Sequence, residues 1–115
     1  MKYMLMIYDR DDWFKTATPE MVADSLEEHG AFAAYLQRRG AAFSGEALHP
    51  STAATTLRPS DDGFVITDGP FVDLKEHFGG FYVLEAADLD DAIEVAKKCP
   101  SAYAIEVRPV MVFDS

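Results

Sequence analysis

The fold of this chain is decided by residues 68–81, which read DGPFVDLKEHFGGF. Three glycines and one proline lie in this stretch among charged residues, and apolar strand-like runs flank it at residues 64–67 and 81–84. A connection of this length without regular structure is unusual in a small domain and is more often functional than idle. The sequence therefore predicts two strands joined by a functional loop.

Length and charge narrow the class of protein. We expect one domain over residues 1–115, because two domains would each be too small, and the 49% apolar content supports a modest core. The net charge of -10 argues against binding to nucleic acid or to an anionic membrane. No apolar run approaches the roughly 20 residues of a membrane span, and the start lacks a cleavage site for a leader. We expect a cytoplasmic protein.

The N-terminal half predicts a strand followed by a helix. Residues 2–8 are apolar on both faces, which is typical of an interior strand. Thr18-Pro19 reads as a helix cap followed by proline at the first helical position, and Gly40 ends the helix. Its predicted inward stripe consists of Val22, Leu26, His29, Ala33 and Leu36, with Phe32 on one flank. An imidazole in this stripe needs a hydrogen-bond partner from the opposing layer.

The remaining chain predicts strands around a second helix. Residues 41–48 suggest a strand with a bend or a close backbone approach at Gly45, and residues 53–57 pair with residues 64–67 as a hairpin. Asp88 caps a helix that ends at Pro100, and residues 103–113 form a long last strand. Pro109 makes the distal half of this strand an edge or a crossing between subunits. The inward stripe of this second helix is predicted to be Leu89, Ala92, Ile93, Ala96 and Cys99.

This order of elements predicts an α+β protein with a ferredoxin-like βαββαβ plan and an inserted hairpin. Two helices cover one face of such a sheet, yet the predicted strands are apolar on both faces. The second face is most economically covered by the same face of another copy across a two-fold axis. We therefore expect a homodimer built sheet to sheet.

Several motifs carry a resemblance to a known family. They are DGPF at residues 68–71, Lys75-Glu76, GGFY at 79–82, LDDA at 89–92, Pro100 and EVRP at 106–109. Nearly the whole chain resembles the DGPF branch of the YCII-related family, which implies a dimeric α+β barrel. Lyases of the wider superfamily have a helix histidine and an aspartate after the middle strands. The resemblance places these on His29 and Asp68.

The leading candidate for chemistry is the pair His29 and Asp68. A carboxylate that holds one imidazole nitrogen raises the basicity of the other and makes a general base near neutral pH. The alternative is a buried histidine satisfied by a turn aspartate, with no catalytic role. The residue types alone favour this alternative, and the resemblance makes the two interpretations about equal.

Other charged residues are candidates for substrate binding. Arg108 could anchor a substrate carboxylate or phenolate, Glu106 could orient it, and Lys75 could order the loop together with Glu76. Simple ion pairs are the competing interpretation. We expect no metal and no cofactor, because the histidines share no ligand spacing and Cys99 stands alone as a buried apolar residue.

Two functions compete at this level. The first is a cofactor-independent lyase or isomerase in which His29, oriented by Asp68, removes a proton from a small polar or aromatic substrate. The second is a non-catalytic module that binds a small molecule or a protein partner, with residues 68–80 as its rim. An oxygen-using monooxygenase is a third, weaker alternative by analogy of fold alone.

Overall fold

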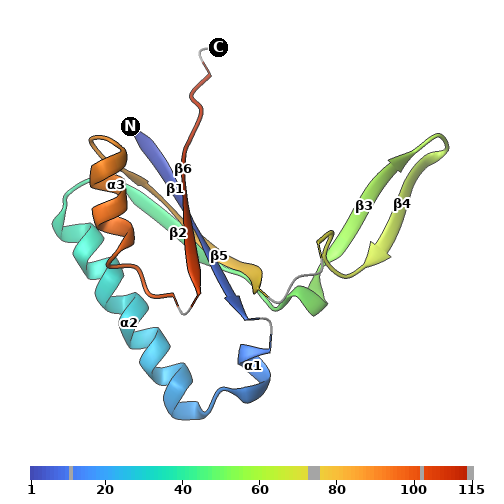
Figure 1. Ribbon diagram of the computed structural model, residues 1–115, viewed down its shortest axis with the longest axis horizontal. Coiled ribbons are helices and arrows are strands. Elements are labelled where there is room, and N and C mark those ends of the chain that lie inside the picture. Colours follow the sequence, from blue (N-terminus) through green and yellow to red (C-terminus); the bar gives the residue numbers. More distant parts are fainter. Residues whose placement is uncertain (11, 73–75, 102, 114–115) are drawn as a thin grey trace.

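The computed structural model describes residues 1–10, 12–72, 76–101 and 103–113 (Figure 1). In these ranges no helix is long and apolar enough to cross a membrane. The elements are, in chain order, β1 (Lys2–Arg10), α1 (Trp13–Thr16), α2 (Pro19–Arg38), β2 (Phe43–Ala47), the 3-10 turn η1 (Ser51–Ala53), β3 (Thr55–Ser60), β4 (Gly63–Asp68), β5 (Glu76–Glu85), α3 (Leu89–Ala96) and β6 (Ala104–Pro109).

The main sheet has four antiparallel strands in the order β2-β5-β1-β6, and we call this sheet with α2 and α3 the body. This α+β arrangement with antiparallel sheets is compatible with the predicted ferredoxin-like fold. The interior position expected for β1 is confirmed, since β5 and β6 flank it. The edge position expected for β6 is confirmed as well.

The core lies between one face of this sheet and the two longer helices. Leu5 of β1 and Val95 of α3 are fully buried, and Phe32 and Leu36 bring α2 to the same cluster. The predicted helix starts are confirmed by their caps. The Met21 amide donates to Oγ1 of Thr18 over 3.1 Å, and the Asp91 amide donates to Oδ1 of Asp88 over 2.9 Å. The caps fix where both helices begin.

The predicted inward stripes of the helices are partly wrong. Val22 and Leu26 are 39% and 70% exposed, because α2 reaches the core only through its C-terminal half. In α3 the predicted Leu89 and Ile93 are exposed, whereas Val95, which the prediction left out, is fully buried. Periodicity therefore found the helices but not the part of each surface that is covered.

Two strand boundaries also differ from the predictions. β5 begins at Glu76, inside the segment predicted as a loop, because its first residues pair with the end of β1, where Arg10 lies opposite Glu76 and Asp9 opposite His77. β6 stops at Pro109 and not at residue 113. Its pairing partner β1 begins near this point, so the chain beyond has no strand to pair with. Both differences come from pairing partners distant in sequence.

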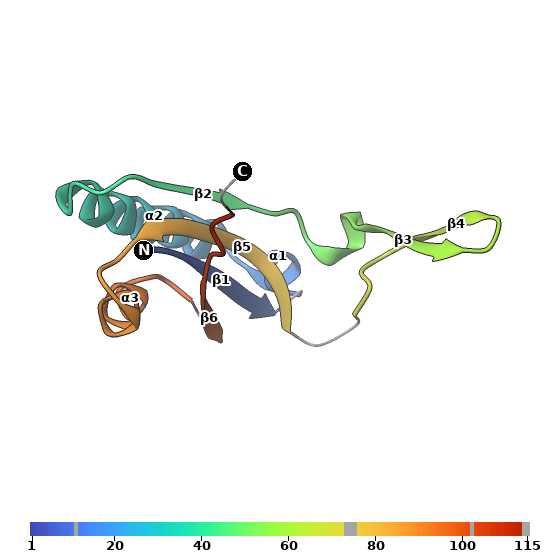
Figure 2. The same ribbon diagram turned by 90° about the horizontal axis from the view of Figure 1, so that it is seen from above.

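β3 and β4 form a separate two-stranded sheet, which we call the arm (residues 55–68). It confirms the predicted hairpin. The arm projects away from the body (Figures 1 and 2), and within it only Thr56 is even half-buried. The Cα radius of gyration is 16.4 Å, whereas a compact chain of this length has about 13 Å. One chain alone is therefore not a compact unit.

The sheet face opposite the helices, called here the open face, carries an apolar centre. Its central residues are Met4, Met6, Tyr8, Phe78, Phe81 and Val83. The ring centroids of Tyr8 and Phe78 lie 5.9 Å apart, and those of Phe78 and Phe81 lie 6.3 Å apart. These side chains are half-buried or exposed in the single chain. The expected second apolar face of the sheet is thus present.

Candidate functional site

His29 lies between α2 and the sheet, where its Nδ1 shares a hydrogen bond of 3.0 Å with the hydroxyl of Tyr82. The predicted need for a partner from the opposing layer is confirmed, because Tyr82 belongs to β5. Gly45 on β2 makes room for this tyrosine: a Cβ at that position would lie 2.6 Å from Cδ1 of its ring. Burial raises the pKa of the Tyr82 phenol, with a smaller contribution from Cys99, so the hydroxyl keeps its proton at neutral pH.

Asp68 lies at the end of β4 on the arm, where it is exposed and pairs with Thr55. In both views the arm points away from α2, which carries His29 (Figures 1 and 2). A single chain therefore holds His29 against Tyr82 and does not bring Asp68 to it. The catalytic pair of His29 and Asp68 stays a prediction, and it requires the aspartate of a second copy.

Two of the three predicted substrate-binding residues, Glu106 and Arg108, lie on β6 of the body. Arg108 Nε and Glu106 Oε2 form an ion pair of 3.0 Å on β6, opposite Met4 and Met6 on the open face. The Arg108 side chain is 72% exposed. This arrangement matches the ion-pair interpretation, and the anchoring role of both residues stays a prediction. Lys75 lies outside the described residues.

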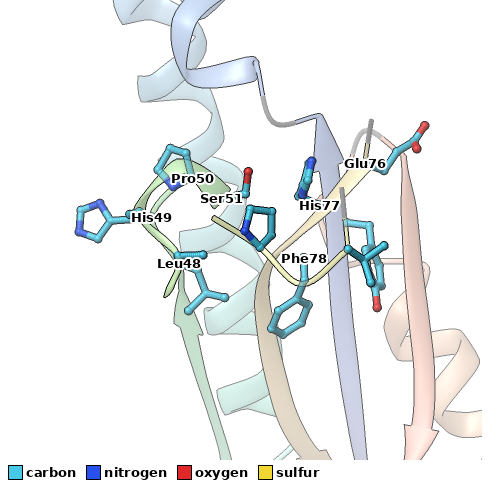
Figure 3. A pocket seen from close by; sticks show the side chains of 12 residues that line it. Leu48, His49, Pro50, Ser51, Glu76, His77 and Phe78 are labelled. Atoms are coloured by element: carbon cyan, nitrogen blue, oxygen red, sulfur yellow. The ribbon is translucent and has the colours of Figure 1, made fainter. Parts of the chain in front are cut away.

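A cavity of about 650 Å³ opens where the end of the sheet meets the connection before the arm (Figure 3). Its volume suits a small organic ligand. Neither His29 nor Asp68 lines it. The lining residues are Tyr8, Leu48, His49, Pro50, Ser51, Ala53, Ala54, Pro70, Val72, Glu76, His77 and Phe78. The cavity thus joins the ends of β1 and β2, the turn η1, the start of β5 and the segment after the arm.

The DGPF segment is held at the base of the arm by one backbone hydrogen bond and one bond from a side-chain hydroxyl. The Gly69 amide donates to the Ala54 carbonyl over 2.8 Å, and the Thr56 hydroxyl donates to the Gly69 carbonyl over 2.7 Å. Gly69 has φ +102°, a conformation that a residue with a Cβ rarely adopts. These contacts place Pro70 in the cavity wall, so the motif found in the sequence is also a structural part of this site.

Side-chain directions distinguish the two histidines that line the cavity (Figure 3). His77 lies among the other labelled side chains and is half-buried, whereas the exposed His49 ring points away from them. Tyr8 and Ser51 add hydroxyl groups to the lining. An imidazole can donate or accept a hydrogen bond and can act as a general acid or base. His77 is therefore the best-placed acid-base group in this cavity.

The charges around the cavity disfavour an anion. Its lining includes Glu76 and no lysine or arginine among the described residues, and the whole chain carries a net charge of -10. Most lining residues are apolar or aromatic. Uncharged or positively charged molecules with an apolar surface are the ligands that such a site favours.

His77 was not predicted as a site residue, because on sequence it entered only the comparison of metal-ligand spacings. Its position between Lys75-Glu76 and Gly79-Gly80, within the most unusual segment of the chain, was the available signal. Among the described residues no three His, Cys, Asp or Glu side chains are grouped to hold a metal ion. Cys99 is buried as expected, and burial raises its pKa to about 12, which keeps the thiol protonated and unreactive.

Comparison with known proteins defines the class. Residues 1–114 match the YCII-related domain, and the chain belongs to this family. It is also 41% identical over 70 residues to an uncharacterised protein of Rhizobium meliloti (strain 1021). The match covers 57% of this chain and 56% of that protein, so the chain spans little more than half the length of this relative.

Proposed function

We propose that this chain acts as a homodimer that binds a small aromatic molecule in the cavity beside His77, within the DGPF branch of its family. The observation that carries the proposal is a cavity of ligand size whose lining includes Pro70 of the DGPF segment and the half-buried imidazole of His77. A binding role needs no second catalytic partner for this histidine. It therefore requires fewer residues to be brought together than catalysis by His29 and Asp68 does.

The apolar open face supports a homodimer. Tyr8 and Phe78 in contact across β1 and β5, with Phe81 stacked on Phe78, form an apolar surface that water would otherwise cover. Pairing of two such faces across a two-fold axis gives the dimeric α+β barrel expected for this family. Tyr8 and Phe78 belong to the open face and to the cavity lining alike. Assembly and ligand binding thus share part of one surface.

The ligand class follows from the chemistry of the walls. Aromatic rings favour a flat ligand, and the phenol of Tyr8 and the imidazole of His77 offer hydrogen bonds to a hydroxyl or amine group. The lack of lysine or arginine among the described lining residues disfavours a carboxylate. A phenol without an acidic group, neutral or with an amine, is the simplest molecule that meets these conditions.

Three probes that share one ring test this proposal by NMR titration of the backbone amide resonances of the cavity-lining residues: p-cresol, tyramine and 4-hydroxyphenylacetate. We expect saturable shifts with p-cresol and tyramine and markedly weaker binding of the acetate. His77→Gln should weaken p-cresol binding about fivefold, the loss of roughly one hydrogen bond. His49→Gln is the matched control and should weaken binding less than His77→Gln does, because the His49 ring points away from the other lining side chains (Figure 3). Equal losses in both variants, or no saturable shift, would contradict the proposal.

A cofactor-independent lyase or isomerase is the second candidate. The observation that favours it is the half-buried imidazole of His77 in the lining of a cavity that can hold a substrate. The form predicted from sequence instead uses His29 as the base with Asp68 of a second copy. Turnover of small phenols and enol acids should be lost in His77→Gln for the first form and in His29→Gln for the second.

A further inference from the structure

The arm exposes an apolar surface on one of its two faces. Register places Leu57 opposite Ile66, and Phe64 follows on the same face two residues before Ile66. These side chains are 53%, 65% and 63% exposed, respectively. Val65 lies on the other face of the same strand, opposite Arg58, and is 51% exposed. We call the surface of Leu57, Phe64 and Ile66 the arm face.

An arm of this kind needs a covering surface. An isolated two-stranded hairpin is at best marginally stable in water and becomes stable when its apolar face packs against another element. In the part of the chain that the structure describes, the arm points away from the body (Figures 1 and 2), and all of its residues except Thr56 are exposed. Something outside this chain must therefore cover it.

We propose that the arm face packs against a second copy of the chain, with each arm lying on the body of the other protomer. This inference rests on the homodimer and the ligand cavity proposed above. A second copy is the partner that the molecule supports, because the same chain displays a second unpaired apolar surface, the open face. A two-fold axis then pairs the two open faces with each other and places each arm against the body of the other protomer.

The size of the interface supports the same partner. A stable interface uses about 20–30 residues from each side, whereas the centre of the open face offers only the apolar residues named above. The arm extends over residues 55–68 and reaches beyond the edge of the main four-stranded sheet (Figure 2). Addition of the arm to the open face brings the contact surface into the range that a lasting dimer needs.

The base of the arm also forms part of the ligand cavity. Ala53, Ala54 and Pro70 line the cavity, and the bonds from Gly69 to Ala54 and from Thr56 to Gly69 tie these residues to the first pair of the arm. A partner that holds the arm in place therefore also holds one wall of the cavity. Ligand binding and dimer formation are thus linked, and each strengthens the other by the same factor.

The test compares Ile66→Asp with Val65→Asp, two substitutions on adjacent residues that face opposite sides of the arm. Sedimentation velocity over a dilution series gives the dimer dissociation constant. We expect Ile66→Asp to raise it on the order of 100-fold, because a charge would be buried in the contact, and Val65→Asp to leave it nearly unchanged. Leu57→Asp, on the facing strand, should repeat the effect of Ile66→Asp.

The same variants are titrated with p-cresol by NMR at a concentration where the wild type and Val65→Asp are dimeric and Ile66→Asp is monomeric. Ile66→Asp should bind it more weakly although residue 66 does not line the cavity, and Val65→Asp should not. A wild-type dissociation constant in Ile66→Asp would overturn arm docking. Dissociation with unchanged p-cresol affinity would overturn the link. If the wild type dimerises through the arm but never binds p-cresol, the proposed ligand fails while arm docking stands.

Discussion

The body and the arm both contain apolar strand residues, but these residues are buried in the body and exposed in the arm. Leu5 and Val95 of the body are fully buried, whereas Leu57 and Ile66 of the arm are more than half exposed. The body has helices on one face of its sheet, and the arm in a single chain has no covering layer. The difference teaches that an apolar strand becomes core only where the chain supplies a second layer, and otherwise becomes surface for assembly.

The largest expected effect tests the comparison of body and arm by the same substitution at one leucine in each. Leu5→Ala should lower the free energy of unfolding by about 2–5 kcal/mol, because it leaves a cavity in a closed core. Leu57→Ala should change it by less than about 0.5 kcal/mol at dilutions where the protein is monomeric, since its side chain is already half in water. Urea unfolding followed by circular dichroism measures both.

This pair also has a clear contrary outcome. If Leu57→Ala destabilises the diluted protein as much as Leu5→Ala does, the arm must be packed within one chain. A loss that grows with protein concentration would instead reflect the dimer.

A second, smaller effect on stability distinguishes Gly45, which is needed for space, from Gly63, which is needed for its backbone conformation. Gly45→Ala should destabilise the body by about 1–3 kcal/mol, because the new Cβ would lie 2.6 Å from the Tyr82 ring and 2.8 Å from the Phe81 carbonyl. Gly63→Ala meets no atom within 4 Å but has φ +123°. It should reduce amide protection in the arm alone, measured by hydrogen exchange. Loss of protection throughout the body in Gly63→Ala would contradict this separation.

The smallest effect concerns an ion pair that ties α3 to the end of α2. Arg39, and then the Ala87 amide, hold the pKa of Asp91 below its usual value. The stabilisation is therefore present above the unfolded pKa of about 3.9 and is lost as pH falls through the lower folded pKa. Asp91→Asn should be less stable than wild type at neutral pH, and the difference should vanish in acid. Thermal unfolding from pH 7 to 3 measures it.

Glu94→Gln serves as the control for that series. Its ion pair with Lys97 is two-thirds exposed on both sides, so its removal should have little effect at any pH. A constant difference between Asp91→Asn and wild type across the whole range would show that the asparagine acts through packing and not through charge.

Much of the fold was predictable because its signals are local. Thr18 and Asp88 satisfy the first amides of their helices whatever surrounds them, and glycine at the turn of the arm permits the positive φ found there. The first residues of β5 were missed because their pairing with β1 joins residues far apart in sequence. The predicted buried faces of the helices were partly wrong because the part of a helix that the sheet covers depends on where the helix ends over the sheet.

The features of the site likewise divide into those that the sequence predicted and those that it did not. The DGPF segment and the unusual position of His29 were visible in sequence, and so was the need for a hydrogen bond to that imidazole. Its partner, Tyr82, was not predicted, because the contact depends on the space above Gly45 on a neighbouring strand. The cavity around His77 was missed for a related reason, since segments from four places in the chain meet there.

The sequence by itself determined the strands and the two longer helices in outline, their order, the helix caps and the membership of a family, because these depend on neighbouring residues and on motif. Tertiary structure alone decided that His29 meets Tyr82, that the base of the arm walls a cavity and that the arm lies uncovered. The physical reason is that burial and pairing are properties of surfaces brought together from distant segments, which no local pattern encodes.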